Sequence, residues 1–133
     1  MSHNKMHRAG VILTLAAAIA VPALVAAPAE ASGGGTAVRA SGGCAGGGVW
    51  TLKAKHDNGR LEIEYEVDTN RVGQLWRVGI SDNNLGVFSG YRRTLAPSGS
   101  FTIRLLTADR AGVDVIRTRS TLGTRSCVGS VRL

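Results

Sequence analysis

The sequence predicts an all-β protein, a seven-stranded antiparallel β-sandwich, and three observations lead to that fold class. Apolar and polar residues alternate with a period of two from Val49 onward, which is the pattern of strands with one buried face. Turn-forming residues interrupt the alternation at intervals of roughly 8–15 residues, a spacing typical of β-sandwiches. No segment after residue 48 carries a helical period, so we expect no helix there.

The composition fits one small folded domain. The chain has 133 residues, of which 44% are hydrophobic and 19% are charged, and this balance argues against a disordered, highly charged chain. Glycine is frequent at 18 residues, but with 3 prolines and no repeating triplet a collagen-like chain is excluded. Two cysteines are too few for a four-cysteine zinc site.

Residues 1–31 have the pattern of a cleaved signal peptide. Lys5 and Arg8 precede an apolar run over residues 11–27, and the tripeptide Ala-Glu-Ala at 29–31 fits a signal-peptidase site. The alternative is a retained N-terminal anchor, which the short run disfavours because a membrane span needs about 20 apolar residues. We therefore expect a secreted or cell-envelope protein with no membrane span after signal cleavage.

Export would place Cys44 and Cys127 in an oxidising compartment, where disulfides form and persist. A bridge between them would close a loop of about 80 residues and, in the chain-entropy account, stabilise the fold by at most roughly 4–5 kcal/mol. Two free buried thiols and an intermolecular bridge are the alternatives. We expect the internal disulfide.

The predicted domain covers residues 49–133, and residues 32–48 precede it. This preceding segment is rich in Gly, Ala and Ser, a composition typical of flexible linkers. We therefore expect a flexible lead that the disulfide holds in place.

The first hairpin is the most specific local prediction. Asn58-Gly59 is a strong signal for a two-residue hairpin turn, because both positions tolerate positive φ. A one-residue slip of the resulting register would bury carboxylates. The register places opposite charges on one face and apolar side chains on the other: Lys55 with Glu62, Lys53 with Glu64, Thr51 with Glu66, Ala54 with Ile63, Leu52 with Tyr65, and Trp50 with Val67.

The remaining strands follow the same alternation. They are expected around Trp76–Ile80, Val87–Arg92, Phe101–Leu105, Ile116–Arg119 and Cys127–Leu133. Turn residues at 82–84, 96–99, 109–112 and 122–124 separate them.

Three features carry a resemblance to a known kind of domain: the segment Ser98–Ile103, the corner Ala108–Gly112, and Trp76 on the third predicted strand. The C-terminal part resembles bacterial immunoglobulin-like or fibronectin type III-like domains, which implies an immunoglobulin-like sandwich over residues 49–133. Antibody-type domains bridge their second and sixth strands, whereas these cysteines lie before the first strand and in the last. The whole pattern is also similar to small secreted proteins of high-GC bacteria with no assigned activity.

No constellation of residues indicates catalysis. Glu62, Glu64 and Glu66 share one strand face at about 7 Å spacing, near the separation used by inverting glycosidases. The lysines opposite would keep these carboxylates ionised, which removes the raised-pKa acid that the mechanism needs. His56, beside the turn, has no evident triad partners. We expect a protein that is not an enzyme and assign no catalytic residue.

Oxygen ligands for calcium are available but incomplete. Asp82, Asn83 and Asn84 form one group, and Asp109 with Asp114 forms another. Neither is a full ligand loop, and turn chemistry accounts equally well for Asp and Asn at these positions. No metal and no cofactor is therefore assigned.

Arginine is concentrated in the second half of the domain. Residues 69–133 hold ten Arg against three Asp, whereas residues 32–68 carry four basic and five acidic residues. In an immunoglobulin-like arrangement the third, sixth and seventh strands share a sheet. Its outer face and edge would then carry the candidate binding residues Arg77, Arg92, Arg93, Arg117, Arg119 and Arg132. The competing explanation is that these arginines only keep the domain soluble, and that a biased genome encodes Arg where Lys would serve equally well.

These observations favour a small exported, non-catalytic binding domain. The planar fork of Arg suits carboxylates and phosphates, so an anionic cell-envelope polymer or an acidic protein is the expected partner. Nucleic acid is disfavoured because aromatic residues do not interleave the basic ones. The alternative is a secreted inhibitor or effector that acts on another protein through a surface loop, such as 82–85 or 92–98.

Overall fold

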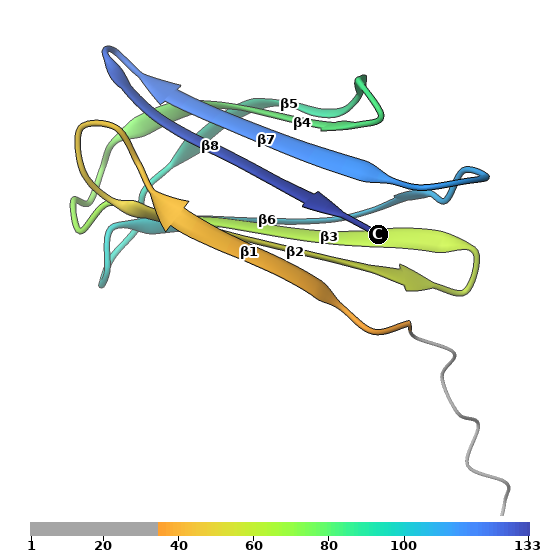
Figure 1. Cartoon of the computed structure of the whole chain (residues 1–133). Coiled ribbons are helices and arrows are strands. Elements are labelled where there is room, and N and C mark those ends of the chain that lie inside the picture. The colour runs from red at the N-terminus through yellow and green to blue at the C-terminus, as the bar shows by residue number, and fades with distance from the viewer. Residues whose placement is uncertain (1–34) are drawn as a thin grey trace, which may run out of the picture. The chain divides into compact units, whose positions relative to one another are not determined.

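The computed structural model describes residues 35–133, and it has the all-β, two-sheet architecture that the sequence predicts (Figure 1). The signal peptide expected over residues 1–31 lies outside the described residues. Within residues 35–133 every regular element is a strand. No helix of this part of the chain is long and apolar enough to span a membrane.

Eight strands form the two sheets, one more than predicted. The first sheet has the order β1-β2-β3-β6, with β1 at Val38–Gly43, β2 at Val49–Asp57, β3 at Arg60–Asp68 and β6 at Ser100–Ala108. The second has the order β5-β4-β7-β8, with β5 at Leu85–Arg93, β4 at Leu75–Asp82, β7 at Val115–Leu122 and β8 at Arg125–Arg132. All neighbouring strands are antiparallel. The prediction that β4, β7 and β8 share a sheet is confirmed.

The additional strand, β1, occupies part of the segment 32–48 for which a flexible lead was predicted, and that prediction is wrong for β1. Trp50 supplies the physical reason. Its indole is buried, and a Cβ added at Gly42 would lie 3.0 Å from the ring. A Cβ at Gly129 of β8 would lie 2.6 Å from it. Gly42, one of the small residues that suggested flexibility, therefore lets β1 run beside the buried indole.

The predicted register of the β2–β3 hairpin is confirmed at all six pairs. Its turn residues Asn58 and Gly59 have φ of 50° and 75°, as a turn with two positive φ values requires. The β4–β5 turn repeats this geometry, because Asn83 and Asn84 have φ of 47° and 70°. Asparagine and glycine therefore appear where the backbone enters the left-handed region.

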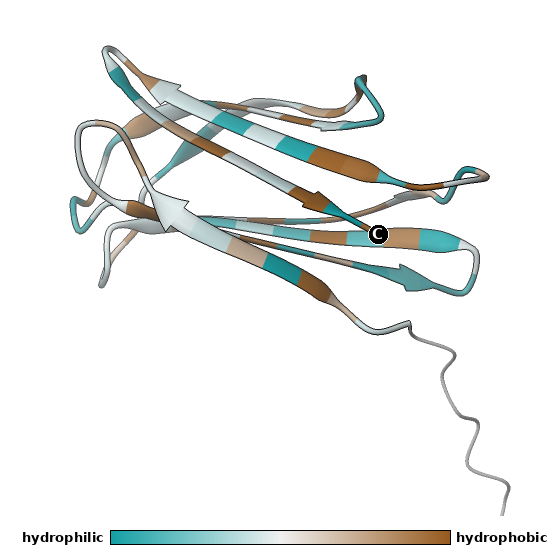
Figure 2. Ribbon diagram, in the orientation of Figure 1, coloured by the Kyte–Doolittle hydropathy of each residue, from teal (hydrophilic) through white to brown (hydrophobic). Residues whose placement is uncertain are grey.

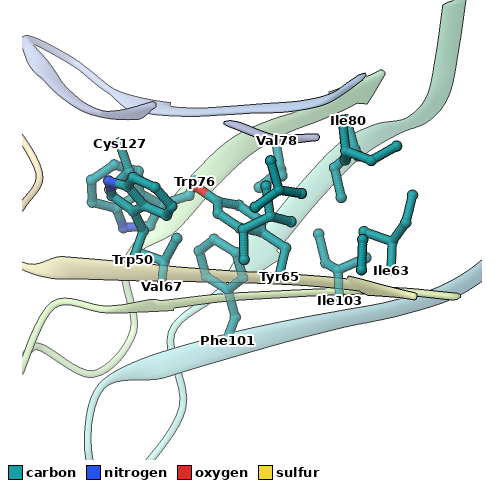
Figure 3. Close-up of a cluster of buried hydrophobic side chains, with 14 of the residues drawn as sticks. Trp50, Ile63, Tyr65, Val67, Trp76, Val78, Ile80, Phe101, Ile103 and Cys127 are labelled. Carbon is teal, nitrogen blue, oxygen red and sulfur yellow. The ribbon is translucent and has the colours of Figure 1, made fainter. Parts of the chain in front are cut away.

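The core lies between the two sheets and is built from every second residue of the strands. Figure 2 shows hydrophilic and hydrophobic bands alternating along β3, and hydrophilic bands alternating with near-neutral ones in the middle of β7. Figure 3 shows the side chains that meet in the interior, among them Trp50, Tyr65 and Trp76. The Tyr65 hydroxyl lies 3.0 Å from Oγ of Ser120, so a hydrogen bond joins β3 to β7 across the core. Burial raises the pKa of Tyr65.

The predicted disulfide between Cys44 and Cys127 is confirmed, with the two Cα atoms 4.3 Å apart. Cys44 directly follows β1 of the first sheet, and Cys127 lies in β8 of the second, so the bridge joins the two sheets covalently. Beside it, Ala45 and Ser126 exchange two backbone hydrogen bonds of 2.7 and 3.1 Å. The sandwich is thus closed along the side where β1 and β8 meet (Figure 1).

Gly129→Ala should destabilise the fold, because the added methyl group would meet the Trp50 ring at 2.6 Å. Overpacking of this kind costs about 1–3 kcal/mol. Urea denaturation of the oxidised protein measures the effect. Gly43→Ala is the matched control, because a Cβ there meets no atom within 4 Å. Equal stability of the two variants would contradict the proposed packing of Trp50.

The buried phenol of Tyr65 should make stability fall at alkaline pH. Its pKa is raised above the ordinary value of 10.0, so above that pH the unfolded chain releases a proton that the folded chain retains. The stability that Tyr65 contributes is therefore complete below pH 10 and is lost as the pH rises toward the folded-state pKa.

Tyr65→Phe should flatten this part of the pH profile and, by removing the hydrogen bond to Ser120, cost about 1 kcal/mol at neutral pH. Denaturant titrations between pH 8 and 11 measure both effects. The exposed Tyr91 provides the matched control, Tyr91→Phe. A slope that is identical in Tyr65→Phe and in the parent protein would show that Tyr65 is not its source.

Candidate functional site

The outward side chains of β4 and β7 form an arginine-rich surface at the centre of the second sheet. Arg77 on β4 and Arg117 and Arg119 on β7 are all exposed. The register places Arg119 opposite Gly79 and Arg117 opposite Ser81. We call the surface made by Arg77, Gly79, Ser81, Arg117 and Arg119 the arginine face.

The arginine face is hollowed around Gly79. Two open depressions of about 330 and 440 Å³ adjoin there, and Gly79 and Arg119 line both of them. Arg77 borders the smaller depression, and Arg117 borders the larger. A Cβ at Gly79 would meet no atom within 4 Å. The missing side chain therefore leaves room between the arginines.

No carboxylate within residues 35–133 pairs with an arginine of this face. The ion pairs that lysine and arginine form in this part of the chain are Lys55–Glu62 and Arg104–Glu64, both on the first sheet. On the arginine face, Nη1 of Arg117 donates a hydrogen bond of 3.1 Å to Oδ1 of Asn84. That contact orients the guanidinium without neutralising its charge. Three guanidinium groups therefore present unneutralised positive charge around one hollow.

The other three predicted arginines lie outside the hollow. Arg93 lies on the edge strand β5, opposite Leu75 of β4. Arg92 is opposite the buried Trp76 and stacks on the Phe88 ring, with 4.7 Å between its Cζ and the ring centroid. Arg132 is exposed near the end of β8. The structure thus gathers Arg77, Arg117 and Arg119 around the hollow. The register places Arg132 on the same outward face, diagonal to Arg117, and Arg93 outward at the β5 edge, whereas Arg92 lies on the opposite face of β5.

The acidic face of the first sheet has the salt-bridged character that the hairpin register predicts. Nζ of Lys55 lies 3.2 Å from Oε2 of Glu62, and Nε of Arg104 donates to Oε2 of Glu64 at 2.8 Å. The hydrogen bond from Arg104 holds the pKa of Glu64 below its usual value. Glu64 is therefore an ionised carboxylate, unlike the raised-pKa acid that glycoside hydrolysis would need.

A second group of polar residues forms where β2 ends beside the β6–β7 loop. Nδ1 of His56 lies 2.9 Å from Oδ2 of Asp109 and 3.9 Å from Oδ2 of Asp114. In the sequence, His56 and the two aspartates are separate candidates with no pattern that connects them. Because 53 residues separate His56 from Asp109, no local spacing could have shown that they meet.

Comparison with known proteins does not identify a family: no family model, no curated protein and no solved structure matches the chain. The arginine face is the surface on which charge, exposure and a hollow coincide.

Proposed function

We propose that the chain is a small exported, non-catalytic domain that binds an anionic cell-envelope polymer on the arginine face. The observation that carries this proposal is the set of three guanidinium groups, unpaired with any carboxylate of the described chain, around the hollow at Gly79. Guanidinium presents parallel N–H donors that match the oxygens of phosphate and carboxylate. Such a surface is suited to holding anions.

A repeating anion fits this surface better than a single small one. Arg117 and Arg119 are two residues apart on one strand, so their Cα atoms are separated by about 7 Å. The depressions are open to solvent, and an isolated small anion there would lose little of its hydration and gain little energy. A polymer with regularly spaced phosphates or carboxylates would contact several guanidiniums at once, which strengthens binding without closer contacts.

Export is the second part of the proposal. The disulfide between Cys44 and Cys127 supports it, because stable disulfides belong to oxidising compartments such as the periplasm and the extracellular space. The signal peptide expected over residues 1–31 would provide the route. A secreted or cell-envelope location would bring the arginine face to the polymer.

We also propose that the sandwich belongs to the immunoglobulin-like class. The division of strands supports this, because β2, β3 and β6 share one sheet while β4, β7 and β8 share the other, as the first, second and fifth strands and the third, sixth and seventh do in that class. The strand β1 and a disulfide to the last strand distinguish this chain from antibody domains.

One loop favours the alternative of a secreted inhibitor or effector. Leu95 in the β5–β6 loop is 61% exposed, although the loop backbone is fixed by hydrogen bonds of 2.8 Å from Leu95 N to Ser100 O and from Gly99 N to Leu95 O. A fixed loop with an exposed apolar side chain can insert into a pocket of another protein. Sub-micromolar inhibition in a protease panel, insensitive to salt and lost in Leu95→Ala, would favour this alternative.

Arg117→Ala/Arg119→Ala should weaken retention on cell-wall fragments that carry anionic polymer. The loss of two charge-assisted contacts is expected to reduce affinity at least about tenfold at low salt and to lower the salt concentration at which the protein elutes. Arg39→Ala/Arg104→Ala is the matched control, because it removes the same charge from the first sheet.

Equal losses in the two double variants would show that net charge alone governs retention. Retention of the parent on an acidic protein fraction, with none on the polymer, would replace the polymer by an acidic protein as the partner. Either result would overturn the proposal of a polymer site on the arginine face.

Gly79→Val tests whether the hollow itself is used. Valine is favoured in strands, and a Cβ at Gly79 meets no atom within 4 Å, so the fold should tolerate the change while the hollow is filled and every arginine is kept. We expect weaker retention on the same cell-wall fragments at unchanged net charge. Gly43→Val on β1 is the matched control, because a Cβ there also meets no atom within 4 Å and Gly43 lines neither depression, and equal retention of both variants would argue against the hollow.

A further inference from the structure

Two aspartates are buried without a hydrogen-bond partner in the described part of the chain. Asp82 at the end of β4 is 1% exposed and Asp114 before β7 is 0% exposed. Neither oxygen of either carboxyl group has a partner among the described residues. Buried carboxylates are normally paired or hydrogen bonded, because removing their charge from water is unfavourable. These two carboxyl groups therefore need another explanation.

Asp114 belongs to the cluster formed with His56 and Asp109. One donor atom from each of these three residues lies within 4.8 Å of the other two. Burial raises the pKa of Asp114 most, and the negative charges of Asp82 and Asp109 raise it further. Asp82 is thus close enough to act on the cluster electrostatically. The Asp114 side chain is fully buried, whereas those of His56 and Asp109 are 42% and 24% exposed, so the cluster lies at the edge of the core and is reachable from solvent.

The fold clamps Asp114 in place. The Asn83 side chain donates to Val113 O and accepts from Val115 N, both at 3.0 Å, so it holds the residues on either side of Asp114. The Asp114 carbonyl accepts a hydrogen bond of 3.0 Å from Leu133 N. These contacts fix the backbone on both sides of Asp114 and so fix the point from which its buried side chain leaves the chain.

Protonation alone does not provide partners for all the buried carboxyl oxygens of Asp82 and Asp114. A single proton shared between Asp109 and Asp114 would give a partner to one oxygen of Asp114 and would leave its other oxygen and both oxygens of Asp82 without one. A divalent cation offsets two negative charges and supplies a partner to several oxygens at once. The unpartnered oxygens of Asp114 and the neighbouring imidazole are thus better explained by a cation than by protonation.

We propose that His56, Asp109 and Asp114 bind a divalent cation, that Zn²⁺ is the best fit, and that Asp82 lies beside it as a further carboxylate. Zinc bonds of about 2.0–2.1 Å at tetrahedral angles place donor atoms roughly 3.4 Å apart. The observed separations of 2.9 and 3.9 Å from Nδ1 of His56 lie on either side of this value.

The types of ligand atom in the cluster favour Zn²⁺ over Ca²⁺. Calcium takes six to eight oxygen ligands, whereas imidazole together with carboxylate is a zinc donor set. A water molecule would complete the tetrahedron, because the donor atoms that lie within 4.8 Å of one another are those of His56, Asp109 and Asp114 alone among the described residues. The site is independent of the arginine face, so either proposal can fail without the other.

The test is zinc binding to the untagged, oxidised protein after treatment with a chelator. One equivalent of Zn²⁺ is expected by calorimetric titration, and Zn²⁺ at 100 times its dissociation constant should raise Tm by roughly 10–20 °C. Asp114→Asn and His56→Ala should each weaken binding more than about 100-fold, since each removes a ligand. Asp114→Asn nearly preserves shape and removes a buried charge, so it should still fold, and its response to zinc is the readout.

Two matched controls accompany these variants. Asp68→Asn removes a carboxylate of β3 that belongs to another contact, with Asn70 N, and it should bind zinc as the parent does. Glu66→Gln removes another carboxylate of β3, one that accepts a hydrogen bond from Thr102, and should also leave binding unchanged.

Three results would overturn the proposal. The first is a Tm that does not respond to zinc. The second is zinc binding that survives both Asp114→Asn and His56→Ala. The third is stabilisation by Ca²⁺ that is as large in His56→Ala as in the parent, because the site would then be built from oxygens alone.

Discussion

The burial of Trp50 between the two sheets is the constraint on which the rest of this structure depends. The indole lies in β2 and contacts Gly42 of β1 and Gly129 of β8. One side chain therefore determines how closely these two edge strands, one from each sheet, can approach it. A buried tryptophan removes roughly 150–250 Å² from water, a large share of what a small core can contribute. The disulfide from Cys44 to Cys127 covers the same region and fixes covalently the approach that the indole requires.

The fixed core determines what the second sheet presents to solvent. On β7, Ile116, Thr118 and Ser120 are buried, and Ser120 is held by the hydrogen bond to Tyr65. Because side chains of a strand alternate between its faces, Arg117 and Arg119 must then point outward. The arginine face is thus a consequence of the core register. The register thereby fixes where Arg117 and Arg119 leave the sheet, and Asn84 orients the Arg117 guanidinium without an acidic partner.

The sequence allowed most of the fold to be predicted where the determining contacts are local or periodic. The Asn58-Gly59 turn set the hairpin register, and alternation identified the inward and outward residues of β7. The strand β1 was missed because its pairing depends on a tertiary contact of Gly42 with Trp50. Composition does not show this contact, and a segment rich in small residues is predicted to be flexible. Arg92 was grouped with the arginine face because sequence does not show which side of an edge strand is covered. The His56–Asp109 contact crosses 53 residues, which is beyond any local pattern.

The β4–β5 turn connects the two candidate sites. Asn83 clamps the residues on either side of Asp114, and Asn84 accepts the hydrogen bond that orients Arg117. Both asparagines adopt positive φ, a conformation that Asn accepts more readily than other non-glycine residues. The requirement for a tight hairpin turn therefore supplies two amide side chains at the same place, one facing the buried carboxylates and one facing the arginines. A cation that orders Asp114 would act on the loop from which β7 begins, three residues before Arg117. The negative and positive sites are thus separate in chemistry but share one turn as their support.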